Sequence, residues 1–123
     1  MTWGDPEGME AAAIVGALRP LLPPQPPGAP GPFALSDQTK LRAFATAAGL
    51  TADAVIDVDS PWSYPDERTA LLGLGSSGVA ARAVTLRGAE AVDMAHRGAL
   101  APFRQSDGSF RIGATRRFLV ARA

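Results

Sequence analysis

The sequence contains no cysteine and only one histidine, His96. The absence of cysteine excludes disulfide bonds, a thiolate nucleophile and zinc sites built on cysteine. Any catalytic triad, histidine relay or histidine-based metal site would have to be built around His96, which lies in a predicted helix and is expected at the surface. The sequence therefore offers little of the usual side-chain chemistry for acid–base or metal catalysis, and we assign no catalytic residue and no metal site.

An excess of charge of either sign is also missing, because 12 Lys and Arg residues balance 12 Asp and Glu residues. Proteins that grip nucleic acid by its phosphates need a basic stripe. Here the longest basic cluster is the pair Arg116 and Arg117, which we expect on a solvated face. The sequence therefore predicts no nucleic-acid partner.

Long hydrophobic runs are absent as well, since no stretch approaches the roughly 20 apolar residues that cross a bilayer. The apolar run 11–18 follows three acidic residues, where a secretory signal would carry positive charge. We expect a soluble, cytoplasmic protein without a membrane partner.

The 123 residues, of which 46% are hydrophobic, suffice for one domain with a core but not for two.

Prolines are concentrated in one segment, the proline-rich loop of residues 20–35. Seven of the eleven prolines lie in its first thirteen positions, with no charged residue among them. Proline lacks the amide donor, so this segment is neither helix nor central strand. Leu21, Leu22 and Phe33 favour a loop that packs on its own domain. Because the prolines also have PxxP spacing, recognition by a proline-binding partner is the alternative.

Apolar residues recur at helical spacing in several segments. The predicted helices are residues 10–18, a helix with Ser36 as its N-cap, a helix opened by Asp66 and Glu67, and residues 77–87 and 89–100. In the second helix, Leu41 and Phe44 belong to the expected buried stripe and Gly49 ends the helix.

Two other segments have strand patterns. Residues 52–59 alternate, with Ile56 and Val58 on one side and Asp57 on the other, which predicts a strand with one wet face. Residues 115–122 contain a continuous apolar run, which predicts a strand buried on both faces that pairs with the first one. Helices and strands together predict an α/β fold with a thin sheet.

The connections near these strands also have recognisable signals. Residues 60–65 contain two prolines and are expected to break the first strand. Turn-forming residues at positions 106–109 predict a hairpin between Phe103 and Phe110.

Three glycines have the GxGxxG spacing of a dinucleotide-binding turn: Gly73, Gly75 and Gly78. That turn requires a preceding strand and an acidic residue about 20 positions later. Here a helix pattern precedes the glycines, so we interpret them as separators of packed helices, with nucleotide binding as a lesser hypothesis.

Three carboxylates on one strand face, Asp53, Asp57 and Asp59, are similarly interpreted as solvated side chains.

Aromatic residues give a more informative pattern, because they lie mainly at the ends of predicted elements. Trp62 and Tyr64 follow the strand 52–59 directly, at the place where open α/β sheets bind their ligands. Their side chains are expected to line an apolar pocket or, equally, to cover a small core beneath the loops.

Four segments together carry a resemblance to a known family. They are Met1-Thr2-Trp3-Gly4, Pro27-Gly28-Ala29-Pro30-Gly31-Pro32-Phe33, Val58-Asp59-Ser60-Pro61-Trp62-Ser63-Tyr64-Pro65 and Arg117-Phe118-Leu119-Val120-Ala121. The whole chain resembles the C-terminal portion of bacterial class I S-adenosylmethionine-dependent methyltransferases, whose Rossmann-like sheet of seven strands ends in an antiparallel pair. The resemblance implies that residues 1–3 end the fifth strand, 52–59 are the sixth and 115–122 the seventh.

By this resemblance, residues 1–123 form a single partial domain, the substrate-side half of a methyltransferase. Trp3, Trp62 and Tyr64 match positions near the substrate cleft, where they would bind a small-molecule methyl acceptor as apolar walls. The glycine-rich loop that binds S-adenosylmethionine in the family is not among these residues, so no cofactor-binding residue can be named and the chain alone is expected to be inactive. Its partner would be a separate N-terminal half. The alternative is a non-enzymatic interaction module that uses the proline-rich loop and an exposed sheet edge.

Overall fold

The computed structural model describes all 123 residues and has an α/β architecture, as the sequence predicts. Its elements, in chain order, are β1 (Thr2–Trp3), α1 (Ala11–Gly16), α2 (Gln38–Ala47), β2 (Thr51–Asp59), β3 (Trp62–Tyr64), α3 (Glu67–Gly75), α4 (Gly78–Arg87), α5 (Ala89–Leu100), β4 (Phe110–Ile112) and β5 (Thr115–Arg122). Two short 3₁₀ turns follow α1 and α5, at Arg19–Leu21 and Ala101–Phe103. Each predicted helix and both predicted strands are present.

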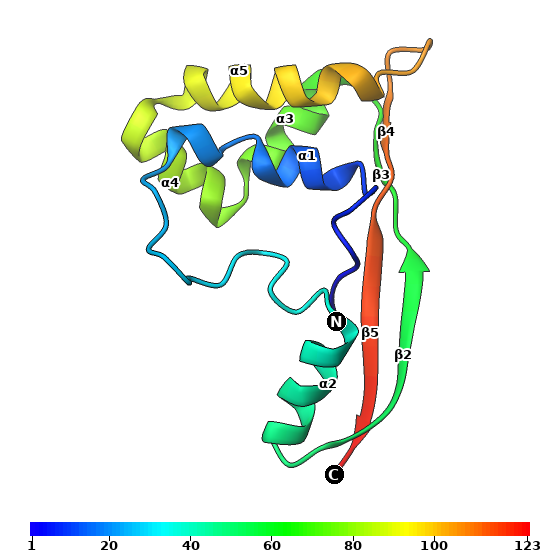
Figure 1. Cartoon of the computed structure of the whole chain (residues 1–123). Helices are drawn as coiled ribbons and strands as arrows, with labels where there is room; N and C mark the ends of the chain where they lie inside the picture. Colours follow the sequence, from blue (N-terminus) through cyan, green and yellow to red (C-terminus); the bar gives the residue numbers. More distant parts are fainter.

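The strands form two small antiparallel sheets that follow one another along a twisted ribbon (Figure 1). In the first sheet β5 lies between β1 and β2 and is antiparallel to both, so β1 and β2 run in the same direction. The predicted pairing of the segments 52–59 and 115–122 is thereby confirmed. In the second sheet β3 pairs with β4, which continues the ribbon beyond β2 and β5.

Two predictions about the connections need correction. Residues 60–65 do not form a simple break, because Trp62–Tyr64 resume the strand as β3 and pair with β4. The turn at 106–109 exists, with Gly108 at φ +84° and the Gln105 amide donating to the Ser109 carbonyl at 2.7 Å. However, only one isolated bridge, Arg104 to Phe110, closes a hairpin there. The residues before the turn, Ala101–Phe103, form a 3₁₀ turn, so only Arg104 is extended beside β4.

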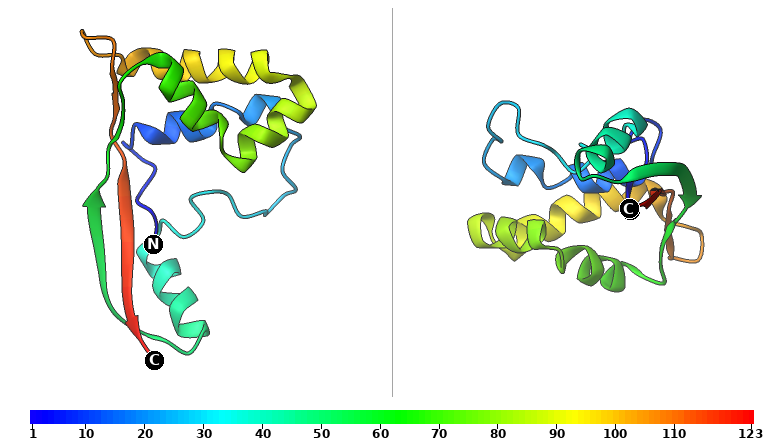
Figure 2. Two further views of the ribbon diagram at one scale, coloured as in Figure 1. Left: turned by 180° about the vertical axis from the view of Figure 1, so that it is seen from behind. Right: turned by 90° about the horizontal axis from the view of Figure 1, so that it is seen from below.

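The helices lie at the two ends of the ribbon. Helices α1, α3, α4 and α5 gather beside β3 and β4, whereas α2 packs alone along β2 and β5 (Figures 1 and 2). Most of the core lies under the four helices. Its nine buried residues are Met9, Ala11, Ile14, Ala70, Leu71, Leu100, Phe110, Ile112 and Ala114.

Side-chain caps explain where three of the helices begin. Asp37, Asp66 and Ser77 each accept a hydrogen bond from the backbone amide three residues later, which satisfies one free donor of the first turn. The N-cap of α2 is therefore Asp37. Ser36, which the sequence predicted as the N-cap, is the residue before it. Gly49, at φ +79°, ends α2, and the Leu50 amide returns to the Ala45 carbonyl at 3.0 Å.

The faces of the β2–β5 pair differ from the prediction. Cross-strand partners point to the same side of a sheet, which puts Ile56 with Phe118 and Asp57 with Arg117. Arg117 is buried on the side of α2, where it also donates to the Ser36 carbonyl. The wet face is the one that carries Ile56 and Phe118, so the expected burial of residues 115–122 on both faces is wrong. Similarly, Phe44 in α2 is 62% exposed.

No single helix is long and apolar enough to cross a membrane. Only α3 and α4 taken together reach the necessary length and composition, and they meet at an angle of 91°.

Candidate functional site

Aromatic side chains meet where the strands β1 and β2 end, beneath the helical end of the ribbon. The ring centroids of Trp3 and Trp62 are 5.7 Å apart, and those of Trp3 and Phe33 are 6.1 Å apart, both in tilted arrangements. We call Trp3, Phe33 and Trp62 the aromatic cluster. Its two tryptophans are brought together by folding from positions 59 residues apart, which the sequence alone could not establish.

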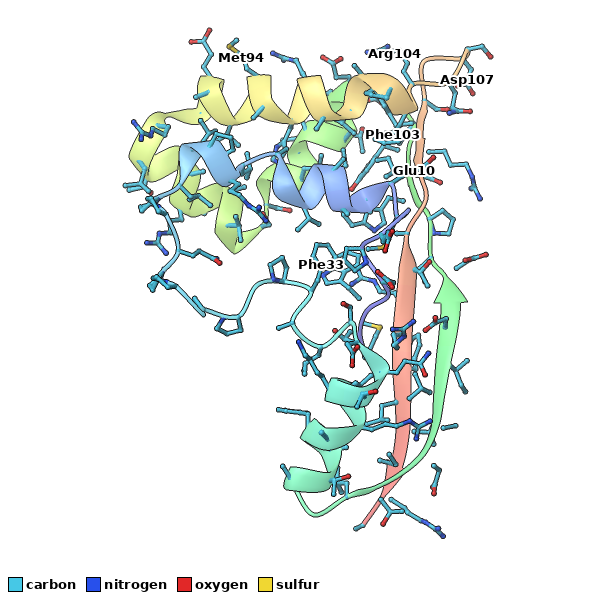
Figure 3. The ribbon with its side chains drawn as sticks, in the orientation of Figure 1. Glu10, Phe33, Met94, Phe103, Arg104 and Asp107 are labelled. Carbon is cyan, nitrogen blue, oxygen red and sulfur yellow. The ribbon has the colours of Figure 1, made fainter.

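Each member reaches the cluster from a different element. Trp3 ends β1, Trp62 begins β3, and Phe33 lies near the end of the proline-rich loop, where the chain passes beside β1 (Figure 3). Strand β1 and strand β2 run in the same direction, so Trp3 and Trp62 both follow carboxyl ends of strands. Open, mostly parallel α/β sheets bind ligands at such ends, although here the antiparallel strand β5 separates β1 from β2.

Tyr64, the third predicted site residue, lies two positions after Trp62 on β3 and therefore on the same side of the strand. Its ring packs against α3, where a methyl group added to Gly73 would come 3.1 Å from Cε1. Burial raises the pKa of the Tyr64 phenol above its ordinary value, so the hydroxyl stays protonated at neutral pH. The structure thus places Tyr64 beside the aromatic cluster without a ring contact to Trp3.

The side chain of Arg116 places a positive charge against the aromatic cluster. The guanidinium carbon of Arg116 lies 3.5 Å from the ring centroid of Trp3, a close cation–π stack. Arg116 is also the cross-strand partner of Trp3 in the β1–β5 pair. The prediction that both arginines of the 116–117 pair are merely solvated is wrong, because one stacks on the cluster and the other is buried.

The aromatic side chains are only partly buried, and they pack against the nine-residue core. They therefore form a wall, with one side anchored in the core and another side reachable from solvent. Sequence reasoning identified Trp3, Trp62 and Tyr64 but did not include Phe33 or Arg116 in the site. The proximity of Phe33 depends on the path of the whole proline-rich loop, which no local pattern specifies.

Two hollows on the surface lie elsewhere. One, of about 540 Å³, runs between Tyr64 and the turn that contains Asp107, with Arg111 on its rim. The other, of about 530 Å³, lies between α3 and α5, where Glu67 accepts hydrogen bonds from Arg97 at 2.9 Å and from Arg104 at 2.7 Å. Neither hollow includes Trp3 or Trp62.

The remaining candidates do not assemble a chemical site. Gly73 and Gly75 lie within α3 and Gly78 begins α4, so a helix precedes these glycines and they form no phosphate-binding turn. Of the strand carboxylates, Asp57 pairs with Arg117 and Asp53 with Arg122. No group of three or more His, Cys, Asp or Glu side chains lies close enough to hold a metal ion.

His96 contradicts its expected surface position, since it is 3% exposed in the stripe of α5 that faces the other helices. Its Nδ1 atom has no hydrogen-bond partner. Burial lowers the pKa of His96, and the nearby Asp93 partly opposes this effect. The side chain is therefore a neutral core residue that lies outside the aromatic cluster.

Comparison with protein-family models, with curated proteins and with solved structures found no match to this chain. The function must therefore be argued from the geometry of the aromatic cluster and the sheet.

Proposed function

We propose that the chain is the substrate-side, C-terminal part of an S-adenosylmethionine-dependent methyltransferase that acts on a small-molecule acceptor. The observation that carries the proposal is the position of the aromatic cluster, at the carboxyl ends of two strands that run in the same direction with an antiparallel strand between them. The antiparallel pairing of the last strand, β5, with β2 is the arrangement that the resemblance implies. The partial Rossmann-like fold is part of the same proposal.

Methyl transfer requires few chemical groups from this half of the enzyme. Transfer of a methyl group by direct displacement depends mainly on holding the acceptor in line with the donor. Trp3 and Trp62 would supply apolar walls that orient the acceptor and keep water away, and Tyr64 a neutral hydroxyl beside them. Such a role needs neither a histidine-centred site nor a metal.

The residues present do not fit S-adenosylmethionine itself. The glycines with the most suggestive spacing lie in helices α3 and α4, and they leave no turn of free backbone amides after a strand. The cofactor would therefore be held by another half of the enzyme, and no step of the reaction is assigned to this chain alone.

Isothermal titration calorimetry with S-adenosylmethionine tests whether the isolated chain lacks a cofactor site, as the proposal requires. We expect no heat of binding to the isolated chain. A micromolar dissociation constant would mean that the cofactor site lies within these residues, against the proposal. The DNA directly upstream of the codon for Met1 is the second observation, because the proposal expects an in-frame or frameshifted GxGxG segment there.

A non-enzymatic interaction module is the second candidate, and the proline-rich loop favours it. Residues 23–32 are all exposed, whereas Leu22 and Phe33 at its two ends are partly buried. The loop is thus anchored at both ends and presents its prolines to solvent. Size-exclusion chromatography separates the two proposals. A well-behaved monomer favours a self-sufficient module, whereas self-association or aggregation favours a sheet that lacks its neighbours.

A further inference from the structure

Arg116 differs from the other arginines that are partly or fully buried. Arg42 donates to a backbone carbonyl of β2, and the buried Arg117 holds Asp57. Arg116 is half-buried, yet its guanidinium donates no hydrogen bond within the chain, and all four ion pairs of the chain use other arginines. A guanidinium carries N–H donors along its whole rim and favours an acceptor when it is partly withdrawn from water. The donors of Arg116 are therefore available to a ligand.

The aromatic cluster holds this guanidinium in one orientation. Its central carbon lies over the Trp3 ring, 3.5 Å from the centroid, so the group lies flat on the indole, because an edge-on guanidinium would bring a nitrogen into the ring. Trp3 is itself held by Trp62 and Phe33. The N–H donors consequently point along the ring surface in one fixed plane. A donor fork of this kind matches a planar carboxylate, which accepts two parallel hydrogen bonds.

The surroundings of Arg116 on the sheet are apolar. Its cross-strand neighbours are Trp3 on β1 and Val58 on β2, and such neighbours lie on the same side of a sheet. Phe118, two positions further along β5, lies on this side too. Val58 and Phe118 are 43% and 37% exposed, whereas the acidic residues next to Val58 in the sequence point to the opposite side. A single positive charge without a neighbouring acid therefore lies within an apolar surface.

We propose that Arg116 binds the anionic group of the methyl acceptor, and that the acceptor is a small aromatic carboxylate. The carboxylate accepts from the guanidinium in its plane, and an aromatic ring that is conjugated with the carboxylate lies in the same plane, parallel to the indole of Trp3. Arg116 is a positioning residue that selects and orients the acceptor and takes no part in the transfer itself. The inference rests on the proposed function, because it takes the aromatic cluster to be the wall of the acceptor site.

An aromatic carboxylate fits these features better than a simple anion or a neutral ring. Inorganic phosphate would satisfy the donors of Arg116 but would leave the apolar surface beside it exposed to water. A neutral aromatic molecule would cover that surface but would leave the guanidinium without an acceptor, which costs free energy in a partly desolvated site. Only a ligand with a planar apolar body and one carboxylate satisfies both parts of the surface.

Intrinsic fluorescence provides a direct test, because the two tryptophans of the chain, Trp3 and Trp62, both belong to the aromatic cluster. The full chain is titrated with benzoate, with benzamide, which has the same shape without the charge, and with inorganic phosphate. Arg116→Gln removes the guanidinium. Arg82→Gln is the matched control, since Arg82 is exposed on α4 and forms no hydrogen bond or ion pair through its side chain. Circular dichroism checks that both variants are folded, and the comparison of benzoate with benzamide on the unmutated chain needs no variant.

We expect saturable binding of benzoate at least about tenfold tighter than that of benzamide and of phosphate, because a charge-assisted fork is lost with either probe or has no apolar body beside it. The preference for benzoate should disappear in Arg116→Gln and persist in Arg82→Gln. Equal binding of benzoate and benzamide, or phosphate binding as tight as benzoate binding, would overturn the aromatic carboxylate and leave the proposed function standing. No response to either aromatic probe would overturn the inference together with the acceptor wall. Binding of S-adenosylmethionine to the same chain in calorimetry would overturn the proposed function, whatever the result with benzoate.

Discussion

The guanidinium of Arg117 holds the carboxylate of Asp57 through two hydrogen bonds, from Nε to Oδ1 and from Nη2 to Oδ2, each 2.6 Å long. The remaining nitrogen, Nη1, donates to the Ser36 carbonyl just before α2 begins. Bidentate pairs of this kind fix geometry as well as charge. Arg117, on β5, therefore connects β2 to the residue just before α2.

Replacing Asp57 with asparagine should destabilise the fold. The variant leaves the buried Arg117 without its ionic partner, and loss of hydrogen bonds to a charged group costs roughly 1–3 kcal/mol. Urea unfolding followed by circular dichroism measures the effect. Asp59→Asn is the control, because Asp59 is exposed on the same strand and makes no ion pair. Equal stability of the two variants would show that the pair contributes nothing.

Buried His96 should make stability depend on pH. Its pKa is lowered from the ordinary 6.5 by burial, so the unfolded chain takes up the proton more readily than the folded one. The contribution of neutral His96 is present above pH 6.5 and is lost as the pH falls below that value, with a slope of at most about 1.4 kcal/mol per pH unit. Unfolding free energies between pH 8 and pH 5 measure this slope.

The matched variant for this prediction is His96→Leu. It removes the unpartnered Nδ1 from an apolar stripe that also contains Val92 and Leu100. We expect a weaker dependence of stability on pH below 6.5 and an unfolding free energy at pH 8 that does not fall. The same dependence in the variant would assign the pH effect to another group.

Local signals in the sequence predicted the elements well, because capping and periodicity act within a few residues. Asp66 before its helix and Gly49 after another mark real ends. The errors concern which face of an element is covered. Ile56 and Phe118 have the pattern of buried residues, yet no helix covers them. Periodicity shows that a face is apolar, but only the packing of distant elements determines what lies against it.

The residues of the aromatic site also divide into those that the sequence identifies and those that only the tertiary fold reveals. Trp62 and Tyr64 could be selected from their place after a strand, and Trp3 from the family resemblance. Phe33 and Arg116 could not, because they reach Trp3 through a long loop and through strand register. Both relationships are set by the tertiary fold rather than by neighbouring residues.

The contact between Trp3 and Trp62 should be measurable in a double-mutant cycle. Aromatic pairs at such distances contribute about 0.5–1.5 kcal/mol beyond their buried area. We expect the effects of Trp3→Leu and Trp62→Leu on the unfolding free energy to be less than additive by this amount. Trp62→Leu paired with Phe44→Leu is the control, because Phe44 lies exposed on α2. Strict additivity of the tryptophan variants would mean that the two rings do not interact.

Glycines 73 and 75 allow a matched test of how α3 packs on β3. Gly73 lies within α3 and Gly75 is its last residue, both without a positive φ, so alanine should favour the helical conformation by about 0.5–1 kcal/mol at position 73 and by up to that amount at position 75. A methyl group at position 75 meets nothing within 4 Å, whereas one at position 73 comes 3.1 Å from the ring of Tyr64. Gly75→Ala should therefore stabilise the fold, and Gly73→Ala should be less stable than Gly75→Ala because the ring has to move. Thermal unfolding of the two variants measures the difference, and equal gains would show that Tyr64 is not packed against α3.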